Sequence, residues 1–188
     1  VILCELSRIS AHLIYVGTTG IDLGAISIFF HTFKERERIY DVFDYVHGHR
    51  MNMSAIRFGG VQNDLDETAL RMIREFCGDF AEKVDEYETL LTDNPIWYAR
   101  NRGVAKLSSE EAVELGLTGP NLRARGVGFD IRKAHPYDAY DRCEFDVPVG
   151  DNGDCYDRWL VRLEEMRQSR RIIEQMLEKI PGGPYLLD

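Results

Sequence analysis

The segment VILCELSRISAHLIYVG, residues 1–17, has the residue spacing of a helix that buries one face. Its apolar residues recur every three or four positions, so they form one stripe on a helix of 3.6 residues per turn. The stripe consists of Ile2, Leu6, Ile9, Leu13 and Val16. Gly17 and Gly20 follow the last of these residues, and we therefore predict a helix over about residues 2–17.

Three further segments repeat this helical spacing, at about residues 23–47, 66–92 and 153–179. Gly48 ends the first of them, and Asp66 can cap the start of the second. Long amphipathic helices must bury their stripes against one another. With 188 residues and 44% hydrophobic content, the chain is long enough for one domain with a sizeable core. We predict a mainly α fold, a single-domain bundle of four long helices.

Two parts of the chain lack the spacing of a long helix. Between Gly48 and Asp66, turn-forming residues surround a short strand-like core at about residues 54–58. Residues 117–152 form an irregular insertion before the last helix. A short helix at about residues 109–115 precedes this insertion, and Ser108 can cap it.

The insertion alternates basic with acidic residues, among them Arg123, Arg125, Asp130, Arg132 and Asp146. This alternation predicts a network of ion pairs rather than a surface of one sign. A solvated charged loop is the simpler alternative, but loops in water seldom carry so many interleaved aromatic residues. The insertion also contains glycines and prolines that fix its backbone. We therefore expect it to hold one conformation and to face a partner or a site.

Composition argues against several classes of function. The net charge of -9 opposes nonspecific binding to nucleic acid or to an anionic bilayer surface, because both require a basic face. The four cysteines show no CxxC spacing and follow no leader peptide, so we expect reduced thiols in a cytoplasmic setting. No apolar run approaches the roughly 20 residues that a membrane-spanning helix needs.

The sequence contains none of the motifs GxxxxGK[ST], GxGxxG, GxSxG and HExxH. His47 and His49 lack a third metal ligand at a credible spacing, and Cys143 and Cys155 alone cannot complete a site. We expect no metal in this chain. Asp22 is open to two interpretations. It caps the amides of the second helix, which the spacing favours, or it polarises a histidine elsewhere.

Longer blocks of the sequence indicate a family. They are ELSRISAHLIYVGTTGIDLGA, FKERERIYDVFDYVHGHRM, IRFGGVQNDL, LTGPNLRARGVGFDIRKAHPYDAYD, FDVPVGDNGDCYDRWLVRLEEMRQS and IPGGPY. Together they resemble the D subunit of NADH:quinone oxidoreductase, the quinone-site subunit of respiratory complex I, which is related to the large subunit of nickel–iron hydrogenases. The resemblance covers essentially the whole chain and implies the central fragment of a longer subunit. A chain that enters a helical pattern without a methionine or a cap agrees with this expectation.

The resemblance implies part of an enzyme, and the fragment alone is expected to be inactive. The subunit would help form the chamber in which quinone is reduced beside the terminal iron–sulfur cluster of a proton-translocating complex. No cofactor is expected in this chain; quinone is the substrate of the complex, and partner subunits carry FMN and the iron–sulfur clusters. Expected partners are the iron–sulfur B subunit, the C subunit and the quinone-channel membrane subunit, which place the chain peripherally on the cytoplasmic side of the cell membrane.

The resemblance also assigns expected roles to single residues. Asp22 matches an acidic residue that pairs with the quinone-binding histidine, which lies outside this chain. Asn52 and Arg57 fall in the block that approaches the terminal cluster, and some relatives have a histidine at the position of Asn52. The charged insertion becomes a subunit interface and a structural clasp. Two alternatives stay open: a helical interaction module without a redox role, and a hydrogenase-like large-subunit fragment.

Overall fold

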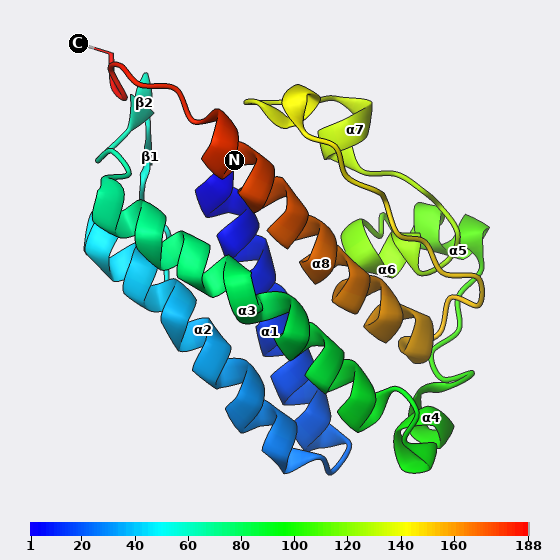
Figure 1. Cartoon of the computed structure of the whole chain (residues 1–188). Helices are drawn as coiled ribbons and strands as arrows, with labels where there is room; N and C mark the ends of the chain where they lie inside the picture. The colour runs from blue at the N-terminus through cyan, green and yellow to red at the C-terminus, as the bar shows by residue number, and fades with distance from the viewer. Residues whose placement is uncertain (188) are drawn as a thin grey trace.

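The computed structural model describes residues 1–187 and confirms the mainly α fold (Figure 1). Its long helices are α1 (Ile2–Asp22), α2 (Ile26–His47), α3 (Glu67–Leu91) and α8 (Cys155–Lys179). Helices α1 and α3 each contact both α2 and α8. The four helices therefore surround one shared interior.

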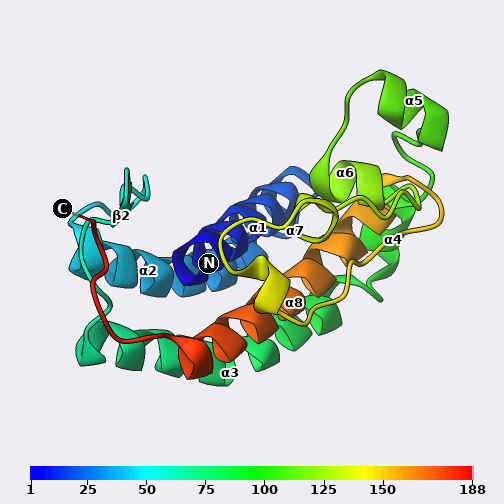
Figure 2. The same cartoon turned by 90° about the horizontal axis from the view of Figure 1, so that it is seen from above.

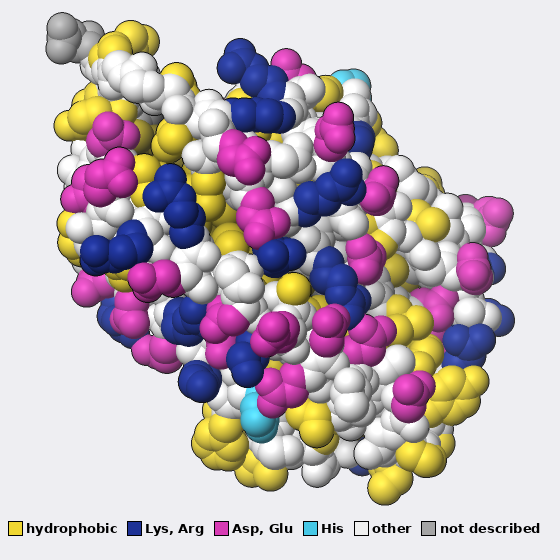
Figure 3. All heavy atoms as spheres, in the orientation of Figure 1, with side chains coloured by type: hydrophobic (Ala, Val, Ile, Leu, Met, Phe, Trp, Pro, Cys, Tyr) yellow, Lys and Arg dark blue, Asp and Glu magenta, His cyan; other side chains and the backbone are white. Residues whose placement is uncertain are grey.

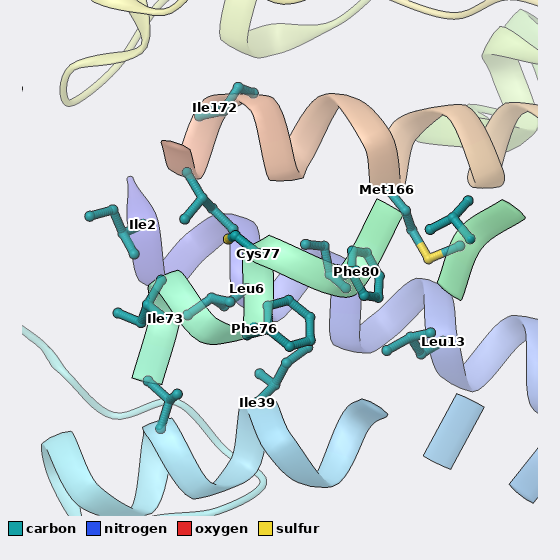
Figure 4. Packing of buried hydrophobic residues seen from close by; sticks show 14 of the residues in the cluster. Ile2, Leu6, Leu13, Ile39, Ile73, Phe76, Cys77, Phe80, Met166 and Ile172 are labelled. Atoms are coloured by element: carbon teal, nitrogen blue, oxygen red, sulfur yellow. The ribbon is translucent and has the colours of Figure 1, made fainter. Parts of the chain in front are cut away.

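This interior is filled by the apolar faces of all four helices. Every residue of the stripe predicted on α1 is buried. Helix α3 contributes Phe76 and Phe80, whose rings stack with their centroids 4.7 Å apart. Figure 4 shows these rings between side chains of α1 and α2 and the Met166 side chain of α8. Burial of this apolar surface, at about 25 cal/mol per Å², is the main force that holds the helices together.

The predicted end of the first helix, near residue 17, is wrong, because α1 continues to Asp22. A Cβ atom on Gly17 would lie 2.6 Å from Oγ1 of Thr32, and one on Gly20 would lie 2.1 Å from Cγ2 of Ile28. These glycines let the backbones of α1 and α2 approach closely. They are packing residues inside the helix and do not terminate it.

Helices α3 and α8 start close to the predicted positions, each at an aspartate. The Asp66 side chain accepts a hydrogen bond from the backbone N–H of Ala69 at 2.8 Å. Asp154 accepts one from the N–H of Asp157 at 2.9 Å. Both contacts satisfy N–H groups that a helix start leaves without a partner. By contrast, α2 starts at Ile26 rather than near residue 23, and its N-terminal cap forms no side-chain hydrogen bond.

The structure also contains shorter elements. The strand-like core is the hairpin of β1 (Ile56–Arg57) and β2 (Gly60–Val61), and α5 (Ser109–Glu114) is the short helix predicted before the insertion. Helix α4 (Pro95–Asn101) was not predicted. The Asn94–Pro95 pair that ends the long-helix pattern also starts this new helix, because the Asn94 side chain accepts from two backbone N–H groups.

The insertion contains α6 (Gly119–Arg123), α7 (Ile131–Ala134) and a 3-10 turn at Tyr140–Arg142. Figure 2 shows it lying across α1 and α8. So little of its backbone is in regular structure that side chains must supply much of its attachment to the bundle.

Candidate functional site

The predicted site residues lie in three separate regions of the molecule. Asp22 is at the turn between α1 and α2, whereas Asn52 and Arg57 lie beyond the far end of α2. Helix α2 has 22 residues, so these two regions are roughly 30 Å apart. The charged residues of the insertion form the third region, over α1 and α8. The chain therefore does not bring the predicted residues into one active centre.

Asp22 is the last residue of α1, and its side chain is exposed. The N-cap of α2 is Ala25, so the prediction that Asp22 caps this helix is wrong. The apolar side chains of Ile21, Ile26 and Phe30 are 42%, 62% and 65% exposed at the same end of the bundle. Figure 3 shows hydrophobic side chains gathered there, while charges of both signs are mixed over the face of α3 and α8. The region therefore combines a carboxylate with an apolar surface.

The hairpin carries Arg57, and the loop before it carries Asn52. Both side chains are exposed. The guanidinium of Arg57 donates to the carbonyl oxygen of Ser54 at 2.6 Å and also to the side-chain oxygen of Gln62. Phe58 is fully exposed at the turn of the hairpin. These contacts hold a cation beside an apolar tip.

The third region contains a network of buried ion pairs around Arg132, which is 1% exposed. Its Nη1 lies 3.0 Å from Oε1 of Glu5 on α1, and its Nη2 lies 2.7 Å from Oδ2 of Asp130. Glu5 also accepts hydrogen bonds from the hydroxyls of Tyr140 at 2.5 Å and Ser169 at 2.6 Å. Glu5 therefore links α1 to both the insertion and α8.

A second part of the network is centred on Glu165 of α8. One of its oxygens accepts a hydrogen bond from Nε of Arg123 at 2.7 Å, and the other lies 2.7 Å from Nε2 of His12. Arg123 also lies 3.7 Å from Asp130, which joins the two parts. All these side chains are buried. The insertion is thus tied to two helices of the bundle by charged groups that are shielded from solvent.

The surrounding charges determine how these groups titrate. Burial alone would raise the pKa of Glu5, but Arg8, Arg132 and the two hydroxyls outweigh burial and hold the pKa below its usual value. The pKa of Glu165 is lowered in the same way, by His12 and Arg123. Burial lowers the pKa of His12 despite its contact with Glu165. At neutral pH, the carboxylates are therefore charged and His12 is neutral.

Two predicted network residues lie outside this buried set. Arg125 is half-buried, and its Nη1 donates to the carbonyl oxygen of Asp151 at 2.9 Å. Asp146 is exposed and pairs with Arg171 at 3.1 Å. Sequence reasoning missed Glu5, His12 and Glu165. For Glu5 and His12 the sequence did contain a signal. Positions 5 and 12 fall on the same face of α1 as the buried positions 2, 9 and 16.

The structure offers no group of three or more His, Cys, Asp or Glu side chains that could hold a metal ion anywhere in residues 1–187. All four cysteines are free. Over the same residues, no helix is both long and apolar enough to cross a bilayer.

The fold and its charge network define a helical scaffold that uses buried ion pairs to fix an insertion onto two of its helices. Residues 22–188 match the family described as respiratory-chain NADH dehydrogenase, 49 Kd subunit, and the chain belongs to this family. This membership favours the respiratory family over the hydrogenase-like alternative.

Among curated relatives, the NADH-quinone oxidoreductase D subunit of Magnetococcus marinus is 49% identical over 100% of this chain and 47% of its own length. The D subunit of Thermus thermophilus is 49% identical over 98% of this chain and 45% of its own. The C/D 1 subunit of Aquifex aeolicus is 52% identical over 94% of this chain and 30% of its own. The chain thus spans about half, or less, of these relatives.

Proposed function

We propose that this chain is part of the quinone-binding subunit of a proton-translocating NADH:quinone oxidoreductase, and that it helps form the chamber in which quinone is reduced. The family membership supports this assignment. The observation that carries it is the position of Asp22 at the end of the bundle where the side chains of Ile21, Ile26 and Phe30 are exposed. A quinone needs an apolar wall for its ring and tail and a polar group near its carbonyl oxygens.

In this proposal, Asp22 acts on a histidine carried by the rest of the longer subunit. A carboxylate beside an imidazole favours the protonated ring, which can then donate a proton as the quinone is reduced. Asp22 is exposed at the end of α1, where an incoming side chain can reach it. Its role is to position and charge that histidine.

We further propose that the hairpin faces the subunit that carries the terminal iron–sulfur cluster. Arg57 is exposed there and can place its positive charge toward the cluster. Asn52 is also exposed, but an amide cannot titrate. Coupling of the cluster potential to a proton at this position is therefore not expected in this protein, and a pH-dependent potential that disappears in Asn52→Ala would contradict the proposal.

The proposed partners are the iron–sulfur B subunit, the C subunit and the quinone-channel membrane subunit, with FMN and the iron–sulfur clusters on partner subunits. The Aquifex aeolicus relative is named for both C and D, which supports an association with the C subunit. Such an assembly would lie peripherally on the cytoplasmic side of the cell membrane. The insertion, whose network fixes its shape, is proposed as one subunit interface.

The test compares Asp22→Asn with Glu178→Gln in the full-length subunit within the assembled complex. Both carboxylates are exposed, but Glu178 lies near the end of α8 that is beside the start of α1, at the opposite end of the bundle from Asp22. We expect Asp22→Asn to lower quinone reduction roughly 10- to 1,000-fold, because it removes the charge that supports a proton donor. NADH oxidation at the flavin should be unchanged in both variants. Normal quinone reduction by Asp22→Asn would refute the role of this residue.

A further inference from the structure

In the charged segment KERER of α2, residues 34–38, the largely buried Arg36 has no carboxylate partner within residues 1–187. Glu35 pairs with Arg38 at 2.6 Å, and Glu37 pairs instead with Arg50. Arg36 forms no ion pair with any carboxylate of residues 1–187, although it is only 8% exposed. A buried cation is costly unless an opposite charge or several hydrogen bonds compensate for its lost hydration.

Two aromatic rings and a hydroxyl fix the position of this side chain. The Cζ atom of Arg36 lies 5.3 Å from the ring centroid of Phe33 and 4.6 Å from that of Tyr40. Its Nε donates a hydrogen bond to Oγ of Ser10 on α1 at 3.0 Å. Cation–π contacts of this kind favour a guanidinium over an ammonium group, because the planar group stacks on the rings. The guanidinium is thus held at the seam between α1 and α2.

One edge of this guanidinium has no acceptor in the protein. The Nη groups of Arg36 donate to no residue among 1–187, and they reach the surface, since they are not among the buried polar atoms without a partner. A carboxylate would accept from both Nη groups, and it would also supply the missing negative charge. Burial lowers the pKa of Arg36, although Tyr40 and Glu37 act in the opposite direction.

We propose that Arg36 binds a carboxylate side chain of a partner polypeptide that packs across α1 and α2. Charge complementarity favours an acidic partner over a neutral one, since the carboxylates of Glu35 and Glu37 are already engaged by other arginines. The inference rests on the proposed function, because only a multi-subunit complex brings a partner to this seam.

The experiment places an amine at this site in the full-length subunit. A zero-length carbodiimide joins an amine only to a carboxylate that touches it, so Arg36→Lys is assembled into the complex, treated with carbodiimide and analysed by mass spectrometry. Arg74→Lys, on the exposed face of α3, is the matched control. We expect position 36 to be linked to an Asp or Glu of a partner subunit, and position 74 to show no such link. No link at position 36, or a link only within the same subunit, overturns the inference.

A second variant does not depend on cross-linking. Arg36→Gln removes the charge, and we expect the partner to dissociate roughly tenfold faster or more in moderate salt, because one member of a buried charge pair is lost. Unchanged dissociation would also overturn the inference. If the complex assembles and reduces quinone but both results are negative, this inference fails alone. A wild-type subunit that joins no complex overturns the proposed function and this inference together.

Discussion

His12 on α1 and Glu165 on α8 are 153 positions apart in the sequence, yet their Nε2 and Oε2 atoms lie 2.7 Å apart. The other oxygen of Glu165 accepts a hydrogen bond from Arg123 of the insertion at 2.7 Å. One carboxylate therefore joins two helices of the bundle to the segment that covers them. This arrangement explains how an insertion with little regular structure keeps a fixed position.

The substitution Glu165→Ala should destabilise the full-length subunit by about 3–5 kcal/mol, because it leaves the buried guanidinium of Arg123 without its strongest partner. The measurement is the free energy of unfolding in urea. Glu178→Ala, an exposed position near the end of the same helix, should change stability by about 0.5 kcal/mol or less. Equal effects of the two substitutions would show that the network contributes little.

Stability should also fall as the pH is lowered below about 6.5, the usual pKa of histidine. The pKa of His12 is lowered in the folded protein by burial, so below pH 6.5 the unfolded chain binds more protons than the native state. The free energy of unfolding therefore decreases with falling pH until the lowered pKa is passed, and below that pH the loss is complete. His12→Gln should flatten this part of the curve of unfolding free energy against pH, whereas His135→Gln, on an exposed residue, should not.

A second decline is expected in more acidic solution, below about pH 4. The pKa values of Glu5, Asp130 and Glu165 are lowered in the folded state, so their contribution is complete above the unfolded pKa values and is lost as these carboxylates are protonated. Acid titration of the full-length subunit, followed by circular dichroism, would measure it. Glu5→Gln should make this decline less steep, and an unchanged slope would contradict the assignment.

The sequence predicts the long helices well because their signals are local. The stripe of Leu6, Ile9 and Leu13 has the helical period, and Asp66 is a cap that acts within one turn. The end of α1 was wrong because Gly17 and Gly20 respond to a neighbouring helix, which no local rule describes.

The candidate site was less accessible to sequence reasoning for a related physical reason. Arg132 and Asp130 are close in sequence, but Glu5, which pairs with Arg132, is 127 positions away. A glutamate on an amphipathic helix usually faces solvent, so its partner cannot be identified before the fold is known. The position of Asp22 was predictable to within one turn, but its environment depends on which side chains α2 exposes beside it.

Alanine substitutions at two glycines of the bundle should change the stability of the protein in opposite directions. In Gly20→Ala, the new Cβ would lie 2.1 Å from Cγ2 of Ile28, so the close contact of α1 with α2 must open, at a cost of about 1–3 kcal/mol. Gly78→Ala, within α3, meets no neighbouring atom within 4 Å and should stabilise the protein by about 0.5–1 kcal/mol. Thermal unfolding of the full-length subunit would measure both. A destabilising Gly78→Ala would contradict this account.

Arg125 and Arg132, two of the three arginines predicted for the insertion, should differ from each other. Arg132 is 1% exposed and contacts both Glu5 and Asp130, so Arg132→Gln strands two buried carboxylates and should cost about 3–5 kcal/mol. Arg125 is half-buried and donates to one backbone carbonyl, so Arg125→Gln should cost about 1 kcal/mol. The free energy of unfolding in urea would rank the two substitutions.

Assembly into the complex provides a second measurement. If the insertion is an interface held in shape by the network, Arg132→Gln should reduce assembly before any change in turnover per assembled complex. Normal assembly with lost turnover would instead give Arg132 a direct part in the chemistry.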